Sequence, residues 1–226
     1  MKMPETSVCQ PLGVFGGTFD PVHFGHLRLA EAAADSLGLA GVRWIPAGRP
    51  VLRDAPRVSA GQRLEMVRLA IAGNPRFELD AAEVEAAQPS YTVPTLERLR
   101  LTEVCGRPRP LVLLVGADAF SGFSGWHRWE SLLDLAHIAV AHRPGYPVEA
   151  DSLPAPLSSV FRERFCTSTS DLAAAPAGRI VCFPMTQLDI SATRIRNLLS
   201  KGHSTRYLMP DAVISHIQKH HFYLEN

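Results

Sequence analysis

Short runs of apolar residues alternate along the chain with longer segments in which apolar residues recur every three or four positions. The short runs have the length of buried strands, and the longer segments have the spacing of helices with one apolar face. This alternation predicts an α/β fold, in which helices cover both faces of a mostly parallel sheet. The predicted strands are 12–15, 42–45, 77–79, 111–115, 138–141 and 180–183. The predicted helices are 26–37, 60–72, 93–101, 129–135, 192–199 and 211–220.

One part of the chain lacks this pattern. Residues 143–178 are rich in Pro, Ala and Ser and contain only a short helical stretch near 158–164. We interpret 148–178 as a variable connection and not as a second domain. A chain of 226 residues without a visible internal repeat fits a single domain over 1–226, at the upper end of usual domain sizes.

Charge narrows the class of partner. The chain has 23 Lys and Arg against 22 Asp and Glu, a formal net charge of +1 at pH 7. Proteins that bind nucleic acid or anionic membranes usually have a clear basic excess, so we expect neither partner. Nearly all of the positive charge is Arg, which suits bidentate phosphate contacts or reflects a compositional bias, and both explanations stay open.

Cysteine usage and the N-terminal residues indicate the compartment. The cysteines are widely spaced, which matches neither a zinc pattern nor a dense disulfide framework. The first ten residues hold no apolar run, and the apolar run 111–115 is far shorter than the ~20 residues that span a bilayer. We therefore expect a soluble, reduced, cytoplasmic protein whose cysteines are buried or unreactive. These are Cys9, Cys105, Cys166 and Cys182.

A glycine-rich turn follows the first predicted strand. Gly16 and Gly17 allow a tight turn that brings backbone N–H groups close to a ligand. Asp20 before Pro21 predicts the start of the next helix, with Asp20 as the N-cap and Pro21 in the first helical position.

Two histidines follow in the first turns of that helix. His23 and His26 are three residues apart, so they share a face at the positive end of the helix, where anions bind. Gly25 between them leaves room for a ligand. Structural histidines and a metal site are the alternatives, although no neighbouring residue completes a set of metal ligands. The pattern favours a phosphate site.

A second helix start lies near the C-terminus. Ser191 is expected to cap a helix, with Ile190 and Ile195 as its hydrophobic staple. Thr193 adds a hydroxyl, and Arg196 adds a guanidinium that can grip phosphate oxygens. An ordinary capped amphipathic helix with exposed arginines is the alternative for this stretch taken alone.

These two segments resemble the paired motifs of the nucleotidyltransferase superfamily. Residues 17–26 resemble its first motif, which is built around His-x-Gly-His, and residues 190–196 resemble its second, Ile-Ser-x-Thr-x-Ile-Arg. The resemblance implies the nucleotidyltransferase fold, a Rossmann-like doubly wound parallel sheet. It also implies that the histidines contact nucleotide phosphates while the second motif closes over the triphosphate from the opposite side.

The middle of the chain narrows the resemblance to one family. Residues 89–96, 115–118 with Trp126, and 141–147 are similar to the Ser-Tyr-Thr-x-x-Thr-Leu, Gly-x-Asp…Trp and Arg-Pro-Gly-Tyr segments of bacterial nicotinate-nucleotide adenylyltransferases. Membership would imply transfer of AMP from ATP to nicotinate mononucleotide, giving deamido-NAD and pyrophosphate. It would also imply Mg²⁺ carried with the ATP, and we expect no dedicated metal site.

The resemblance carries roles for individual residues. The catalytic residues would be His23, His26 and Arg196. The ATP-binding residues would be Gly16, Gly17, Thr18, Phe19, Gly116, Asp118, Ile190, Ser191 and Thr193. The residues that bind the acceptor substrate would be Arg53, Tyr91, Thr92, Trp126 and Arg143.

Each of the middle residues also has a simpler explanation. Trp126 suits stacking on a pyridinium ring but could equally belong to a core or an interface. Asp118 follows a predicted strand, where a carboxylate can accept from ribose hydroxyls. Arg143 could meet an acidic substrate group or be a solvated loop residue. Residues 48–54 depart from the family's Pro-Pro-His-Lys-like stretch, which leaves Arg53 as the basic replacement.

Three alternatives remain at this stage. The acceptor could be nicotinamide mononucleotide or phosphopantetheine, although the phosphopantetheine branch usually has Thr where His23 stands. The chain could also be a non-catalytic nucleotide-binding module, which would be expected to have lost His23, His26 or Arg196. We interpret His216, His220 and His221 as a surface helix and not as a metal site. Association into a homo-oligomer stays open.

Overall fold

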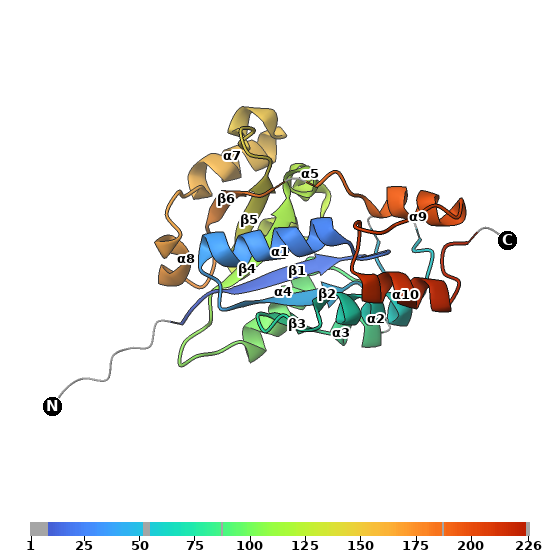
Figure 1. The fold of residues 1–226 in the computed structure, drawn as a ribbon. Coiled ribbons are helices and arrows are strands. Elements are labelled where there is room, and N and C mark those ends of the chain that lie inside the picture. Colours follow the sequence, from blue (N-terminus) through green and yellow to red (C-terminus); the bar gives the residue numbers. More distant parts are fainter. Residues whose placement is uncertain (1–8, 52–54, 87, 187, 225–226) are drawn as a thin grey trace.

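The computed structural model describes residues 9–51, 55–86, 88–186 and 188–224. Within these residues, six parallel strands form one sheet in the order β3-β2-β1-β4-β5-β6 (Figure 1). From β1 to β3 the chain adds strands toward one edge of the sheet, and from β4 to β6 it adds them toward the other edge. The structure is therefore a doubly wound Rossmann-like sheet, as predicted. The strands are β1 Leu12–Gly17, β2 Gly41–Pro46, β3 Phe77–Leu79, β4 Leu111–Gly116, β5 His137–His142 and β6 Ile180–Pro184.

Helices cover both faces of this sheet (Figure 1). The α-helices are α1 Phe24–Leu37, α2 Ala60–Ile71, α3 Ala82–Glu85, α4 Thr92–Thr102, α5 Ala117–Ser121, α6 Leu132–Leu135, α7 Ala155–Arg164, α8 Ser170–Ala174, α9 Ala192–Ser200 and α10 Asp211–Lys219. Short 3₁₀ helices are η1 Phe123–Gly125, η2 Trp129–Ser131 and η3 Ala150–Ser152. In the described part of the chain, no helix has the length and apolar character needed to cross a membrane.

Burial on both faces explains the continuous apolar runs in the sequence. In β4, Leu111, Leu113 and Val115 pack into the cluster beneath α4 and α7. Val112 and Leu114 of the same strand pack into the cluster beneath α1 and α10. A parallel strand with helices on both sides is therefore apolar at every position and does not alternate.

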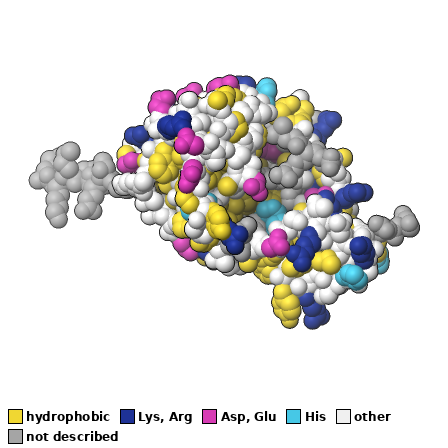
Figure 2. Space-filling view, turned by 90° about the horizontal axis from the view of Figure 1, so that it is seen from above, with side chains coloured by type: hydrophobic (Ala, Val, Ile, Leu, Met, Phe, Trp, Pro, Cys, Tyr) yellow, Lys and Arg dark blue, Asp and Glu magenta, His cyan; other side chains and the backbone are white. Residues whose placement is uncertain are grey.

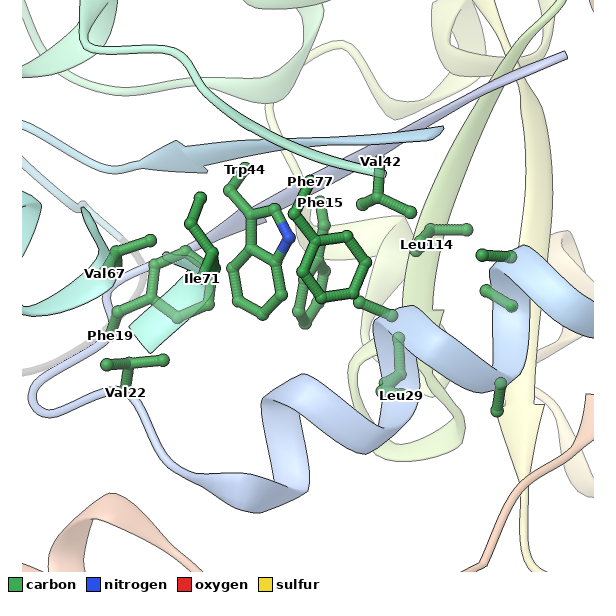
Figure 3. Close-up of a cluster of buried hydrophobic side chains, with 14 of the residues drawn as sticks. Phe15, Phe19, Val22, Leu29, Val42, Trp44, Val67, Ile71, Phe77 and Leu114 are labelled. Carbon is green, nitrogen blue, oxygen red and sulfur yellow. The ribbon is translucent and has the colours of Figure 1, made fainter. Parts of the chain in front are cut away.

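The cluster beneath α1 and α10 contains a group of aromatic side chains (Figure 3). Trp44 of β2 is fully buried, and the ring centroids of Phe15 and Phe19 lie 4.9 and 5.4 Å from its own. Phe77 of β3 lies 5.4 Å away on the same basis. Because Phe19 comes from the loop after β1, this core anchors that loop directly to the sheet.

The predicted strands are confirmed, and the predicted helices differ mainly at their ends. The first helix begins at Phe24, two residues before the predicted range 26–37 and later than the Asp20–Pro21 capping signal indicates. The predicted helix 129–135 is a 3₁₀ turn followed by the short α6. Residues 148–178, which were expected to hold one short helix, contain both α7 and α8.

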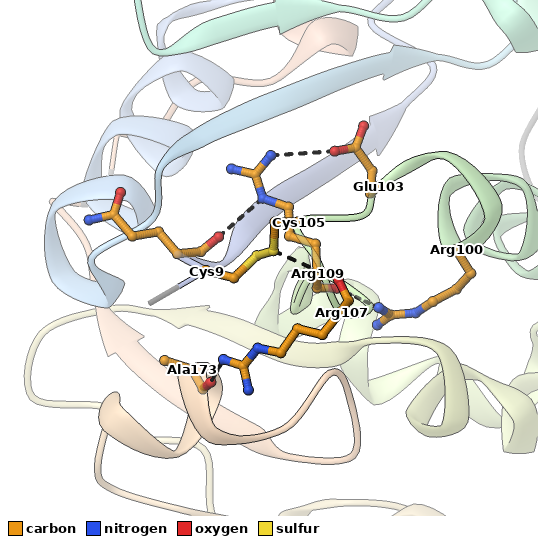
Figure 4. The surroundings of a disulfide bond; sticks show 8 residues. Cys9, Arg100, Glu103, Cys105, Arg107, Arg109 and Ala173 are labelled. Atoms are coloured by element: carbon orange, nitrogen blue, oxygen red, sulfur yellow. Dashed lines mark hydrogen bonds and ion pairs between the residues drawn. A yellow bond between two sulfur atoms is a disulfide. The ribbon is translucent and has the colours of Figure 1, made fainter. Parts of the chain in front are cut away.

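The expectation that all four cysteines are reduced is wrong for two of them. A disulfide joins Cys9, just before β1, to Cys105 in the loop after α4 (Figure 4). The pair is 96 residues apart in the sequence. Because β1 and β4 are neighbours, the segments that enter them meet, and Leu12 N–H donates to Pro110 O at 2.9 Å. Cys166 and Cys182 are free, and burial raises the pKa of Cys182 to about 11, which keeps its thiol protonated and unreactive.

Candidate functional site

The loop after β1 leads into α1 at the carboxyl edge of the sheet, beside the point where the strand order reverses. His23 is the N-cap of α1, so the prediction that Asp20 caps this helix is wrong. The Asp20 carboxylate is engaged elsewhere: one oxygen accepts from the Arg57 N–H at 2.9 Å, and the other accepts from the Tyr223 hydroxyl at 2.7 Å. With Asp20 held by these partners, the chain enters the helix three residues later.

The two histidines lie together at this helix start, as predicted. Their rings stack with centroids 3.7 Å apart, and the His23 N–H donates to Nδ1 of His26 at 3.2 Å. Because Nδ1 of His26 is an acceptor, a neutral His26 carries its proton on Nε2. Burial lowers the pKa of His23 to about 4, so its imidazole is neutral near pH 7.

One atom of this pair stands out. Nδ1 of His23 is buried and has no hydrogen-bond partner within the described residues. A buried polar atom without a partner costs free energy, and such atoms in native proteins often await a ligand or water. The stacked pair lies at the positive end of α1, where an anion is favoured, and this buried nitrogen lies close to Gly25.

The small residue between the histidines is closely packed. A Cβ on Gly25 would lie 3.0 Å from the His23 ring and 3.6 Å from the carbonyl oxygen of Ile190. The absence of a side chain at Gly25 therefore lets the His23 ring and the second motif lie close to this backbone, and room for a ligand stays a prediction.

In the glycine-rich turn after β1, the ring of Phe19 packs closely against the backbone of Gly17. A Cβ on Gly17 would lie 2.9 Å from the ring of Phe19, which is buried and has a positive φ of 52°. The Phe19 side chain thus belongs to the core, and only its backbone is available to a nucleotide. Gly16 is exposed at the end of β1, and Thr18 directs its carbonyl oxygen to Arg63 at 2.7 Å.

The second motif has the local structure that the sequence predicts. Ser191 is the N-cap of α9, and its hydroxyl accepts from the N–H of Arg194 at 3.2 Å. An open depression of about 340 Å³ lies against this helix start. It is lined by Ser191, Thr193, Arg194, Asn197, Leu198, Lys201 and His203. Figure 2 shows Lys and Arg side chains gathered on the side of the molecule that carries α9 and α10.

Arg196 brings the two motifs together. Its guanidinium donates to the backbone oxygen of Asp20 at 2.7 Å across a separation of 176 residues, and to the Thr193 hydroxyl at 3.3 Å. The predicted phosphate-binding segments therefore meet at one place, with Arg196, His23 and the start of α9 around it.

Sequence reasoning missed one buried arginine at this edge. Arg63 of α2 is 1% exposed and donates to the carbonyl oxygens of Thr18 at 2.7 Å and Gly48 at 3.1 Å. It thus ties the loop after β1 to the loop after β2. The available signal was its position three and four residues before the apolar Met66 and Val67, which places it on the buried face of α2.

The predicted acceptor residues lie around the start of α4. Tyr91 is its N-cap, and the Tyr91 ring lies 4.5 Å from that of His127, next to Trp126 in the chain. The Trp126 ring packs 4.4 Å from Phe123 and is half-buried. A small depression of about 170 Å³, lined in part by Ser90 and Tyr91, lies beside them.

A buried carboxyl group, also missed, supports this helix start. Glu83 accepts from the Thr95 hydroxyl at 2.5 Å and is hydrogen-bonded by Ser90. Burial raises its pKa. Ser90 is bonded in turn to Arg49 in the loop after β2, through both its backbone and its hydroxyl. The Ser90–Tyr91–Thr92 turn is therefore fixed from two sides.

The remaining predicted residues are spread along the same edge of the sheet. Gly116 ends β4 and caps α5, and Asp118 is exposed in the first turn of α5. Arg143 follows β5 and lies over the ring of Tyr146 at 5.0 Å. Thr92 begins α4 and is half-buried. Arg53 lies outside the described residues.

The C-terminal histidines pack on one another. The ring of His216 on α10 lies 4.5 Å from that of His220, the residue that caps the end of this helix, and His220 stacks on Phe222 at 5.4 Å. Across the residues that the structure describes, no group of three or more His, Cys, Asp or Glu side chains is arranged to hold a metal ion.

Comparison with known proteins gives concordant results. The family model described as cytidylyltransferase-like matches residues 14–198. A relative from Dechloromonas aromatica, named "probable nicotinate-nucleotide adenylyltransferase", is 62% identical over 95% of this chain and 98% of its own. One of the same name from Hydrogenovibrio crunogenus is 45% identical over 94% of this chain and 97% of its own.

A solved structure shares the fold. The nicotinic acid mononucleotide adenylyltransferase of Plasmodium falciparum, complexed with NaAD, superimposes with a TM-score of 0.69. Its sequence identity is 13%, and the match covers 95% of this chain and 97% of that one.

Proposed function

The chain belongs to the cytidylyltransferase-like family and within it to the nicotinate-nucleotide adenylyltransferases, and we propose that it joins ATP and nicotinate mononucleotide. The products are deamido-NAD and pyrophosphate, which places the reaction in NAD biosynthesis. The observation that carries the proposal is the bond from Arg196 to Asp20, which gathers both predicted phosphate-binding motifs at one edge of the sheet.

The chemistry is a substitution at phosphorus. An oxygen of the mononucleotide phosphate attacks the α-phosphorus of ATP in line, and the bond from that phosphorus to the bridging oxygen of pyrophosphate breaks. Such a transfer needs alignment of the two substrates and neutralisation of charge more than it needs a covalent intermediate. The chain supplies groups of that kind here: two imidazoles, a guanidinium and the positive ends of two helices.

His23 is proposed to act at the α-phosphoryl group. Its position at the positive end of α1 favours an anion beside its ring, and an approaching phosphate favours the protonated ring. His26, Arg196, Ser191 and Thr193 are proposed to hold the rest of the triphosphate. The backbone from Gly16 to Phe19, together with Gly116, Asp118 and Ile190, is proposed to line the nucleoside.

Mg²⁺ is proposed to arrive with the ATP. It keeps several of its waters and takes few protein ligands, and when bound it would offset the charge that builds up on pyrophosphate. The residues around the helix starts fit this arrangement. They are mainly donors, and both carboxylate oxygens of the buried Asp20 already accept hydrogen bonds.

The acceptor is proposed to bind between the start of α4 and the turn before η2. Trp126 would stack on the pyridine ring, while the Tyr91–Thr92 backbone and Arg143 would meet acidic groups of the mononucleotide. Arg53 is proposed as the basic contact from the loop after β2. We also propose that the reaction takes place in the cytoplasm.

Pyrophosphate release tests the proposal. Purified protein is supplied with ATP and Mg²⁺ and with nicotinate mononucleotide, nicotinamide mononucleotide or phosphopantetheine in parallel, and a reaction without acceptor gives the background. We expect rapid release with nicotinate mononucleotide alone. Faster release with nicotinamide mononucleotide would make that compound the acceptor substrate. Release with none of the three would overturn the proposed activity.

A further inference from the structure

A buried polar cluster lies where the C-terminal turn meets the loop after β1. The hydroxyl of Tyr223, which follows α10, donates to one carboxylate oxygen of Asp20 at 2.7 Å. The other carboxylate oxygen accepts from the Arg57 N–H at 2.9 Å. Asp20 is only 6% exposed, so these bonds replace the water that would otherwise solvate its charge.

Two guanidinium groups balance the buried carboxylate. Arg196 donates to the backbone oxygen of Asp20 at 2.7 Å and lies 3.8 Å from a carboxylate oxygen. Arg63 also interacts electrostatically with Asp20 and with Tyr223. Burial and the neighbouring carboxylate raise the pKa of Tyr223, so its hydroxyl stays protonated and acts as the donor.

This arrangement fixes the direction in which Arg196 points. Asp20 cannot rotate freely, because each carboxylate oxygen has its own donor, one from the C-terminal turn and one from the 55–58 segment. Without the Tyr223 hydroxyl, one carboxylate oxygen would be left buried without its donor, and the carboxylate would be free to turn toward Arg196, which lies 3.8 Å from the other oxygen. The guanidinium would then be drawn away from its position beside Thr193.

We propose that Tyr223 is a positioning residue for ATP, which through Asp20 holds the Arg196 guanidinium in the orientation that grips the polyphosphate. This inference rests on the proposed function, since it takes ATP as the ligand of Arg196. It gives the C-terminal turn a part in nucleotide binding, although Tyr223 lies 203 residues from the loop that it acts on. A purely structural tyrosine would instead only fasten the C-terminal turn to the body of the protein.

The test compares Tyr223→Phe with the wild type in the full chain. The substitution keeps the ring and removes only the hydroxyl. We expect the Kd for ATP, measured by isothermal titration without acceptor, and the KM for ATP to rise about tenfold, the loss that follows from one hydrogen bond to a charged group. The KM for nicotinate mononucleotide should stay close to the wild-type value, and the melting temperature should fall by only a few degrees, because one buried carboxylate oxygen loses its donor.

Tyr207→Phe is the matched control. This substitution also removes only a hydroxyl, but Tyr207 is 85% exposed. A double-mutant cycle with Asp20→Asn adds a second check: the effect of Tyr223→Phe should shrink once the carboxylate is gone. Unchanged ATP binding in Tyr223→Phe, or a fall in melting temperature with equal rises in both KM values, would overturn the inference. Wild-type protein that binds ATP but releases no pyrophosphate would count against the proposed function and leave this binding comparison intact.

Discussion

At the scale of single residues, His23 has the clearest expected effect on the reaction. Its ring is neutral and buried, with one nitrogen unsatisfied at a helix start. Replacing it with Ala removes one preorganised group that stabilises developing charge, so kcat should fall by about 10²–10³. Single-turnover and steady-state rates of pyrophosphate release measure this, and unchanged circular dichroism shows that the fold persists. Near-normal turnover in His23→Ala would remove His23 from the catalytic assignment.

The lowered pKa of His23 also makes stability depend on pH. The unfolded chain binds a proton near the ordinary pKa of 6.5, whereas the folded chain binds it only near 4. Between these values the unfolded state holds more protons, so stability falls as the pH drops from 6.5 toward 4, by at most about 3 kcal/mol from this residue.

Urea unfolding at pH 7 and at pH 4.5 measures this effect. Burial also lowers the pKa of His137, so the wild type alone does not isolate His23. The loss of stability between the two pH values should be smaller in His23→Gln than in the wild type. Equal losses in the two proteins would show that the folded protein protonates His23 without difficulty.

At the scale of elements, the junction between β1 and α1 depends on a glycine that touches both motifs. In Gly25→Ala the new Cβ would lie 3.0 Å from the His23 ring and 3.6 Å from the Ile190 carbonyl oxygen, so the ring has to shift. We expect a loss of at least about tenfold in kcat, because small misplacements of catalytic groups are costly.

Gly61→Ala is the matched control, because a Cβ there meets nothing within 4 Å. Gly61 lies in the first turn of α2, where Ala is a better helix former, so this variant should keep full activity and gain up to about 1 kcal/mol of stability. Pyrophosphate release and urea unfolding of both variants make the comparison. Full activity in Gly25→Ala would mean that the His23 ring has more freedom than its packing indicates.

The same junction shows how far the sequence predicts these elements. Central strands such as β4 were predictable because burial on both faces leaves an unbroken apolar run. The start of α1 was not, because Asp20 is an excellent N-cap by local rules but is taken by Tyr223, 203 residues away. Both phosphate motifs were visible as sequence, whereas their contact through Arg196 and the brace formed by Arg63 depend on how the sheet brings distant loops together.

At the scale of the whole molecule, the candidate site lies at the carboxyl ends of the strands, and the disulfide lies at their amino ends. The described candidate site residues follow the carboxyl ends of β1, β3, β4, β5 and β6, whereas the Cys9–Cys105 disulfide lies where β1 begins (Figure 4). At the amino ends of the strands, the guanidinium of Arg109 donates hydrogen bonds to Gln10 O and to the Glu103 carboxylate. Stability and activity should therefore respond separately to changes at the two edges.

Removing the disulfide tests this separation. The bond closes a loop between residues 96 positions apart, so breaking it frees the unfolded chain, and Cys105→Ser should lose about 2–4 kcal/mol of unfolding free energy. Wild-type protein reduced with dithiothreitol should unfold at the same lower urea concentration, while Cys166→Ser, which alters a free thiol, should not respond in this way. Adenylyl transfer at 25 °C should be equal in all of these proteins, because the bond lies at the amino ends of the strands. Equal unfolding of oxidised and reduced wild type would show that the bond contributes nothing to stability, and a large loss of activity in Cys105→Ser would show that the two edges are coupled through the sheet.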